Sequence, residues 1–322
     1  MTLGVTSPFR VDAPPLAELK FRHPAVTAKG EPRAVVPPAG LDTLWFNTGT
    51  LCNLACATCY IESSPRNDAL VYISEAEVRA YLDEIAFLGL PTREIGLTGG
   101  EPFMNREIIP ILRLALERGF AVLVLTNAMR PMRRWEDQLL ELRDRHADKL
   151  TFRVSLDHYT QGAHEAERGP GTWAKALDGL EWLAANGFSL AIAGRQLPRE
   201  DLAAAREGYA RLFAAHNLPV DAADPARLVL FPEMDASADV PEISEACWSI
   251  LGKAPDNVMC ASSRMVVKRR GEPAPRVAAC TLLPYDPGFD MGATLGEALR
   301  PVALNHPHCA RFCVLGGASC TA

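Results

Sequence analysis

Three cysteines, Cys52, Cys56 and Cys59, lie close together with the spacing C-x3-C-x2-C. Three thiolates on one loop can bind three irons of a cubic [4Fe–4S] cluster and leave the fourth iron without a protein ligand. An iron with an open position can bind a substrate or a cofactor, as a catalytic metal site does. The alternatives for the same thiols are a zinc knuckle or chance clustering, although zinc normally takes four ligands and no nearby His or Cys supplies the fourth.

Most of the other cysteines lie near the C-terminus, and two of them flank an expected hairpin around Gly271. This second group is Cys260, Cys280, Cys309, Cys313 and Cys320. Five cysteines fit one further [4Fe–4S] cluster with one thiol left over. We expect Cys260, Cys280, Cys309 and Cys313 to be the ligands, with Cys320 as the main substitute. A zinc ion would use the same thiolates.

Three residues near the second group are not expected to be ligands. Cys247 lies in EACWSIL, an expected helix, and is typical of a small buried apolar residue. His306 and His308 lie beside Cys309, but histidines in a loop near a site are usually not ligands.

Alternating strands and helices are expected to position the first cysteine group. Ser74 and Glu77 form a capping-box pair at the start of one helix, and Gly89 ends it. The helices are expected over 74–89, 105–118, 133–146, 172–186, 199–215 and 243–251. The apolar runs typical of strands are 43–47, 94–99, 120–126, 150–156, 188–194 and 226–232.

This order of elements predicts an α/β fold with a parallel sheet covered by helices. Periodicity alone leaves open whether the sheet is doubly wound or part of a barrel, but in both cases ligands bind at the carboxyl ends of the strands. Residues 1–40 are rich in proline and are expected to form an irregular arm. Residues 41–250 are expected to form the core and 251–322 a small cysteine-rich second domain.

The residues around the first cysteines carry a family resemblance. CNLACATCY at 52–60 strongly resembles the signature loop of the radical S-adenosylmethionine superfamily, and TGGEP at 98–102 looks like its GGE motif. Thr126-Asn127 and VSLD at 154–157, with His164 and Arg168-Gly169 downstream, are similar to further family segments at strand ends. The resemblance covers roughly residues 43–235 and implies a partial (β/α)6 TIM-like barrel. The tail resembles the small auxiliary-cluster domains called SPASM or twitch.

The resemblance implies a [4Fe–4S] cluster and S-adenosylmethionine as cofactors. Reductive cleavage of the bound S-adenosylmethionine then gives methionine and a 5′-deoxyadenosyl radical, which takes a hydrogen from a substrate. By the same resemblance, the cofactor's binding residues are Tyr60, Gly99, Gly100, Glu101, Asn127, Ser155 and Arg168.

The expected roles of these residues differ. Gly99 and Gly100 would let the backbone approach the cofactor, and Glu101 would accept a hydrogen bond from the methionine ammonium. Ser155 is a candidate for the ribose hydroxyls and Arg168 for the methionine carboxylate. The alternatives are a plain turn, an ordinary strand-end hydroxyl and a surface cation.

One residue departs from the family pattern. The family usually has an aromatic residue just before the third cysteine, near the adenine, whereas this sequence has Thr58, with Tyr60 on the other side of Cys59. Apolar strand residues around Ile192, Gly194 and Phe231 are further candidates for adenine contacts, although such residues are far more often core.

Composition limits the partners. The formal net charge of −6 argues against a broad nucleic-acid footprint. No apolar run is long enough to span a membrane, and the N-terminus lacks the apolar region of a secretory signal, so a cytoplasmic protein is expected. The expected substrate is a peptide or a small molecule, and the expected electron donor is an external flavodoxin or ferredoxin. The alternatives are a zinc- or cluster-binding scaffold and an electron carrier, both without radical chemistry.

Overall fold

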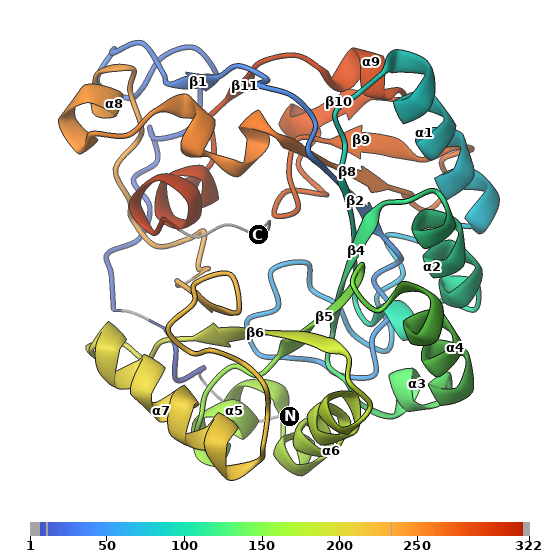
Figure 1. The fold of residues 1–322 in the computed structure, drawn as a ribbon. Helices are drawn as coiled ribbons and strands as arrows, with labels where there is room; N and C mark the ends of the chain where they lie inside the picture. The colour runs from blue at the N-terminus through green and yellow to red at the C-terminus, as the bar shows by residue number, and fades with distance from the viewer. Residues whose placement is uncertain (1–6, 11, 233, 318–322) are drawn as a thin grey trace.

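The computed structural model describes residues 7–10, 12–232 and 234–317. Its main sheet has nine strands in the order β10-β9-β8-β2-β3-β4-β5-β6-β7 (Figure 1). The six strands from β2 to β7 are parallel neighbours, as an α/β barrel segment requires. They are β2 (Thr43–Asn47), β3 (Glu94–Thr98), β4 (Ala121–Thr126), β5 (Leu150–Ser155), β6 (Ser189–Arg195) and β7 (Leu228–Phe231).

Most of the helices lie around the outside of this curved sheet (Figure 1). These are α1 (Glu75–Leu88), α2 (Ile108–Glu117), α3 (Arg130–Arg133), α4 (Glu136–His146), α5 (Gln161–Arg168), α6 (Thr172–Ala185), α7 (Leu202–Ala215) and α9 (Leu295–Ala298). Helix α8 (Ala246–Leu251) lies beside the N-terminal arm instead (Figure 1). This arrangement confirms the predicted α/β class and the partial barrel.

Local sequence signals explain several of these boundaries. The capping box of Ser74 and Glu77 opens α1, and Gly89 ends it in the left-handed conformation, as predicted. The helix expected from Asn105 begins later, at Ile108, because the short helix η1 (Pro102–Met104) comes first. The carbonyl oxygen of the Asn105 side chain instead accepts a hydrogen bond from the Glu107 N–H at 2.9 Å. Helix α5 was not anticipated from the sequence.

Strand register brings the carboxyl ends of the six strands to one edge. Asn47 pairs with Thr98, Thr126 with Val154, Ser155 with Ala193 and Arg195 with Phe231. The loop that carries Cys52, Cys56 and Cys59 follows β2 at this edge. The predicted placement of the cysteine loop is therefore confirmed.

The main sheet continues past the expected domain boundary near residue 250. Strand β8 (Ser263–Val267) pairs in parallel with β2, and it forms an antiparallel hairpin with β9 (Arg276–Ala278). Gly271 lies in the connection with φ of 83°, which confirms the predicted turn. Strand β10 (Asp290–Gly292) completes this edge, followed by β11 (Val302–Ala303) and the helical segment η5 (Cys309–Leu315).

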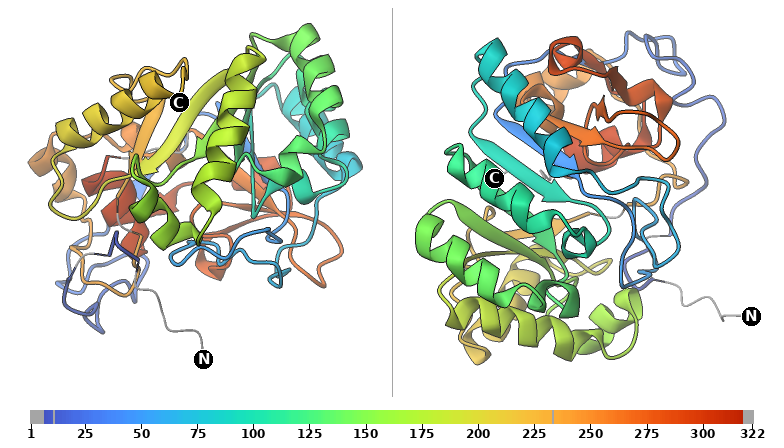
Figure 2. Two further views of the ribbon diagram at one scale, coloured as in Figure 1. Left: turned by 90° about the horizontal axis from the view of Figure 1, so that it is seen from below. Right: turned by 90° about the vertical axis from the view of Figure 1, so that its right-hand side faces the viewer.

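The N-terminal arm runs along the C-terminal part of the chain (Figure 2). Its strand β1 (Val35–Val36) pairs antiparallel with β11, and isolated bridges join Pro15 to Ala238 and Arg33 to Ser244. The described part of the arm is mostly irregular, and these pairings fix it to the second half of the molecule.

Candidate active site

One cavity lies at the carboxyl edge of the parallel strands. Its wall includes the side chains of the three loop cysteines and residues from the ends of five consecutive strands. The strand-end residues are Thr98, Gly99, Gly100, Leu125, Thr126, Asn127, Ser155, Asp157, Ala193, Arg195 and Phe231. The structure therefore brings together segments that are distant in sequence, as expected for the C-terminal face of a barrel.

The thiols of the cysteine loop suit a thiolate-ligated cluster. Cys52 Sγ accepts a hydrogen bond from the Leu54 N–H at 3.4 Å, and Cys59 Sγ accepts one from the Ser63 N–H at 3.3 Å. Such N–H donors to sulfur stabilise cluster ligands and tune their potential. Burial raises the pKa of Cys52 to about 12 and that of Cys56 to about 11. Metal binding must therefore displace protons from these thiols.

The donor geometry also bears on which metal group fits. In the described part of the chain, no three His, Cys, Asp or Glu side chains are arranged so that they could together bind one metal ion. A cubic cluster spreads its ligands over separate irons, so its thiolates do not have to converge on one point.

Hydrogen bonds fix the cysteine loop to the neighbouring strand β4. The amide of Asn127 donates to the side-chain oxygen of Asn53 at 2.9 Å. The backbone N–H of Asn127 in turn donates to Glu101 at 2.9 Å. Asn127 lines the cavity, and it also positions the loop between Cys52 and Cys56.

Glu101 has a different environment from the one the sequence suggested. Its fully buried carboxylate is absent from the cavity wall and accepts hydrogen bonds from Thr126 Oγ1 at 2.8 Å and from the N–H groups of Asn127 and Phe103. Burial raises its pKa to about 7. The carboxylate thus joins the end of β3 to the end of β4 beneath the cavity.

The two glycines before Glu101 allow a close approach between chain segments. A Cβ on Gly100 would lie 2.3 Å from the Leu51 carbonyl oxygen, and one on Gly99 would lie 2.5 Å from that of Gly49. Gly99 also has φ of +148°, which favours glycine. Both residues line the cavity, but the backbone that they admit is that of the segment entering the cysteine loop. The predicted need for glycine thus has a second reason in the structure, and the approach of this backbone to the cofactor stays a prediction.

Arg168 lies in the cavity wall at the end of α5. Its Nε donates to Asp157 Oδ2 at 2.5 Å. Burial alone would lower the pKa of Arg168, but the charges of Asp157 and the Cys56 thiolate raise it. The surface-cation alternative for Arg168 is therefore wrong. Ser155 and Tyr60 also line the cavity, and their contact with the cofactor stays a prediction.

A buried network around Thr58 was missed by the sequence reading. Glu167 accepts hydrogen bonds from the Thr58 N–H and hydroxyl, each at 2.8 Å, and one from the Ser7 hydroxyl at 2.5 Å. Arg195 donates to Thr58 Oγ1 at 2.6 Å, lies 3.4 Å from Glu167 and covers the ring of Phe9. The only sequence signal was that Glu167 precedes the motif residue Arg168.

His164, part of the family-like segment, lies in the core rather than in the cavity wall. It is fully buried and meets Trp173 edge-on, with ring centroids 5.5 Å apart. Ile192 is likewise core, and a Cβ on Gly194 would meet the Tyr209 hydroxyl at 2.3 Å. Of the three weaker adenine candidates, only Phe231 lines the cavity.

A second, mostly apolar cavity contains the C-terminal cysteines. Cys260, Cys280, Cys309 and Cys313 all line it. Cys309 and Cys313 lie four residues apart in η5, which places them on the same face of the helix. Burial and the neighbouring Cys280 and Cys260 raise the pKa of Cys309 well above its usual range. The four predicted ligands thus meet in one place.

The remaining candidates near this second cavity differ from one another. His308 is buried in its wall, and in the part of the chain that the structure describes its Nδ1 has no hydrogen-bond partner. Cys247 is half-buried on α8 and contacts Ser244, away from both cavities. Cys320 lies outside the described residues.

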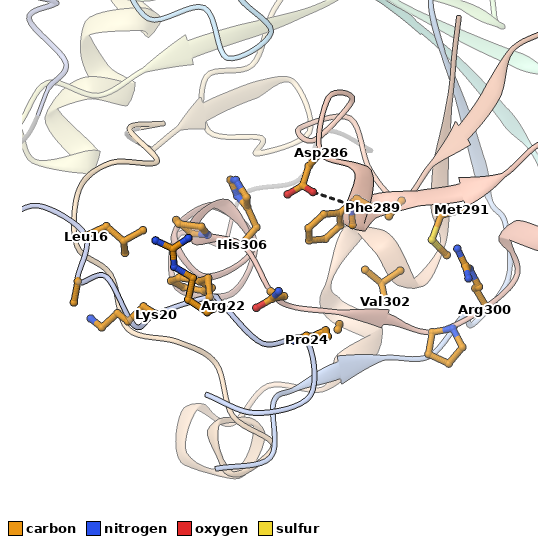
Figure 3. Close-up of a pocket in the computed structure, with 18 of the residues that line it drawn as sticks. Leu16, Lys20, Arg22, Pro24, Asp286, Phe289, Met291, Arg300, Val302 and His306 are labelled. Carbon is orange, nitrogen blue, oxygen red and sulfur yellow. Dashed lines mark hydrogen bonds between the residues drawn. The ribbon is translucent and has the colours of Figure 1, made fainter. Parts of the chain in front are cut away.

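A groove of about 730 Å³ shares part of its wall with the second cavity, and Figure 3 shows the side chains that line the groove. The arm contributes Leu16, Lys20, Arg22 and Pro24, and the C-terminal part contributes the other wall. Ala279, Phe289 and Val302 line both the groove and the cysteine cavity. Lys20 is already paired with Asp239 at 2.7 Å.

Comparison with known families identifies the superfamily of the chain. Residues 46–205 match the profile of the Radical SAM superfamily. This chain belongs to the radical SAM superfamily. The matched segment contains the cysteine loop, both glycines and Arg168, so the predicted family is confirmed. Members of this superfamily use a [4Fe–4S] cluster and S-adenosylmethionine.

Curated relatives of this radical SAM chain match less than half of it. The antilisterial bacteriocin subtilosin biosynthesis protein AlbA of Bacillus subtilis is 34% identical over 143 residues, 44% of this chain and 30% of AlbA. Mycofactocin maturase MftC of Mycobacterium ulcerans is 30% identical over 138 residues, 43% of this chain and 35% of MftC. The chain thus matches about a third of the length of each relative.

Solved structures share the fold. Streptococcus suis SuiB bound to S-adenosylmethionine superposes with a TM-score of 0.57 at 11% identity, covering 79% of this chain and 64% of SuiB. Native anSMEcpe with bound AdoMet superposes with a TM-score of 0.55 at 14% identity. The superposition covers 80% of this chain and 79% of anSMEcpe. None of the described helices is both long and apolar enough to cross a bilayer.

Proposed function

We propose that this chain is a radical SAM enzyme that cleaves S-adenosylmethionine reductively and directs the resulting radical to a hydrogen of a peptide substrate. The observation that carries this proposal is the shared cavity of Cys52, Cys56, Cys59 and the carboxyl ends of five barrel strands. When bound, the reduced cluster and S-adenosylmethionine supply a 5′-deoxyadenosyl radical. The protein's part is to bind, orient and isolate these groups.

Each wall of the cavity has its own role in this proposal. Cys52, Cys56 and Cys59 hold the cluster at one end. Arg168, oriented by Asp157, presents a fixed cation for a carboxylate of the cofactor. Ser155 and Asn127 offer a hydroxyl and an amide from neighbouring strand ends. Glu101 acts from beneath as a positioning residue, because its carboxylate joins β3 to β4.

Apolar side chains also line this cavity. They are Leu125, Phe231, Met234, Leu282 and Phe312. Apolar lining excludes water from the reacting groups, which protects a reactive species from side reactions. Phe312 belongs to η5, between Cys309 and Cys313, so the segment that carries two of the C-terminal cysteines contributes to this wall.

The second cavity supports a proposal of one auxiliary [4Fe–4S] cluster held by Cys260, Cys280, Cys309 and Cys313. Leu282 lines both cavities, which places the two sites next to each other. An auxiliary cluster there can accept an electron from a substrate radical, making the net reaction an oxidation, or bind the substrate at an open iron. An external flavodoxin or ferredoxin is the proposed source of electrons for the first cluster.

A peptide substrate is favoured by the similarity to AlbA, a bacteriocin biosynthesis protein. The test is to supply candidate peptides deuterated at carbon to the reduced, reconstituted enzyme. Deuterium in the recovered 5′-deoxyadenosine is expected for the true substrate. If peptides from the enzyme's own gene neighbourhood transfer none while a small molecule does, the peptide assignment is wrong.

Iron counting tests the two-cluster arrangement separately. After anaerobic reconstitution, about eight irons per chain are expected for two cubic clusters, and about four for one. If the C-terminal thiols bind zinc instead of iron, the proposal of an auxiliary iron–sulfur cluster is wrong. The proposal of radical chemistry at the first site is not affected by that result.

A further inference from the structure

Arg264 is a fully buried arginine next to the C-terminal cysteines. It lies on β8 with 1% of its surface exposed. Its guanidinium donates to the main-chain carbonyl oxygens of Cys260 at 2.5 Å, Ser263 at 2.7 Å, Ala298 at 2.9 Å and Arg300 at 3.1 Å. The N–H groups of Arg264 therefore have hydrogen-bond acceptors, but these acceptors are neutral carbonyl oxygens and do not balance its charge.

The charge of Arg264 is not balanced by a carboxylate. Within the described ranges, no Asp or Glu lies at ion-pair distance from it. Arg33 gives the contrast: it is equally buried, with 1% exposed, and its Nη2 pairs with Glu242 at 2.6 Å. A buried charge is normally paired, because removing it from water is costly.

Arg264 is joined directly to the second cavity. Its Nη1 donates to the main-chain carbonyl oxygen of Cys260, four residues earlier in the chain, at 2.5 Å. Cys260 and Cys280 line the second cavity with Cys309 and Cys313. Thiolates that hold a metal group in this cavity would supply the negative charge that balances Arg264.

We propose that Arg264 is the counter-ion of an anionic metal–thiolate cluster in the C-terminal cavity. This inference rests on the auxiliary cluster of the proposed function. Four thiolates around an iron–sulfur core give the site a net negative charge, and reduction adds another electron. A fixed buried cation stabilises the reduced state more than the oxidised state, so Arg264 raises the reduction potential of this cluster.

The experiment isolates the C-terminal cluster in the full-length chain. Replacing Cys52, Cys56 and Cys59 by Ala removes the first site and leaves about four irons for the second. In this background, Arg264→Gln, Arg264→Lys and the matched control Arg33→Gln are reconstituted without oxygen. Iron and zinc are counted, and the reduced fraction is followed by electron paramagnetic resonance against applied potential.

Loss of the charge is expected to shift the titration to lower potential. In Arg264→Gln, the ratio of reduced to oxidised cluster at a fixed potential should fall about tenfold. Arg264→Lys, which keeps the charge, should titrate near the parent, and Arg33→Gln should leave the potential unchanged. A folded, iron-loaded Arg264→Gln with the parent's potential would overturn the inference.

Two further outcomes are also decisive. If Arg264→Gln does not fold, Arg264→Lys decides: a titration near the parent's supports the counter-ion, and a clear shift to lower potential contradicts it. If the parent binds no iron at the second site, the auxiliary cluster itself fails. The iron count detects that outcome. It is therefore distinguishable from the case in which the cluster is present but the Arg264→Gln variant has the parent's reduction potential.

Discussion

The Glu167 carboxylate accepts two hydrogen bonds from Thr58, one from the main-chain N–H and one from the hydroxyl, both at 2.8 Å. Thr58 occupies the position where the family usually has an aromatic residue. Its hydroxyl also accepts a hydrogen bond from Arg195 at 2.6 Å. The departure from the family pattern is thus matched by a buried polar network that fixes the segment between Cys56 and Cys59.

Weakening this network should loosen the cysteine loop. Glu167→Gln keeps the shape of the side chain but removes the charge that Arg195 and the Thr58 donors face. We expect the affinity for S-adenosylmethionine to fall about tenfold, since charge-assisted hydrogen bonds contribute about 1.5–3 kcal/mol each. Equilibrium binding to the reconstituted enzyme measures this. Glu165→Gln on the same helix, which caps Gly171 and Trp173 instead, is the matched control. Equal affinities in the two variants would contradict the role of Glu167.

Gly100→Ala should displace the cysteine loop from β3. The new Cβ would meet the Leu51 carbonyl oxygen at 2.3 Å and the Thr50 carbonyl oxygen at 2.7 Å, and these backbone atoms cannot rotate away. Loss of roughly half of the iron is expected, corresponding to the first of two cubic clusters.

Gly162→Ala in α5 is the control for Gly100→Ala, because nothing lies within 4 Å of its new Cβ. This change should leave the iron content unchanged and add up to about 1 kcal/mol of stability. Full iron binding by Gly100→Ala would show that the close approach is not needed.

The four cysteines of the second cavity should be distinguishable from Cys320. Cys280→Ala is expected to lose about four irons. It should still produce 5′-deoxyadenosine in an uncoupled reaction, but not turn over substrate. Cys320→Ala should keep all the iron, because Cys260, Cys280, Cys309 and Cys313 already share one cavity. Iron loss in Cys320→Ala with retention in Cys313→Ala would reverse the ligand assignment.

Acid should destabilise the protein partly through His164. Burial lowers the pKa of His164 to about 4, against 6.5 in the unfolded chain. The folded state therefore disfavours the proton, and the stability present above pH 6.5 is lost as pH falls from 6.5 toward 4. This loss should reach about 2 kcal/mol near pH 4.5.

His164→Phe keeps a flat ring against Trp173 and removes the titration. The difference in free energy of unfolding between the variant and the wild type should therefore grow in favour of the variant below pH 6.5. Chemical denaturation at several pH values measures it. A difference that does not change with pH would exclude His164 as a source of acid lability.

Much of the fold could be predicted because its signals are local. The capping box at Ser74, the apolar strands and the glycine-marked turns each act within a few residues. The pairing of β8 with β2 joins residues more than two hundred positions apart in sequence, and no periodicity reports it. The same is true of the arm, whose Ser7 reaches Glu167 across the molecule.

The site was predictable where a motif defines it and not where tertiary contacts do. The loop cysteines, Asn127, Ser155 and Arg168, which the motifs singled out, all line one cavity. The roles of Glu101 and Gly100 depend on which backbone lies opposite them, which the sequence does not reveal. Arg264 could not be singled out, because its importance depends on the neutral groups that the fold places around its guanidinium rather than on a sequence pattern.

Formation of 5′-deoxyadenosine tests the central claim most directly. The wild type, Cys56→Ala and Cys247→Ala would be reconstituted and reduced without oxygen in the presence of S-adenosylmethionine, and the product quantified by mass spectrometry. Cys247 lies away from both cysteine cavities, which makes it the matched control. The account predicts product from the wild type and Cys247→Ala and none from Cys56→Ala. A wild type with a full complement of iron and no 5′-deoxyadenosine would contradict it.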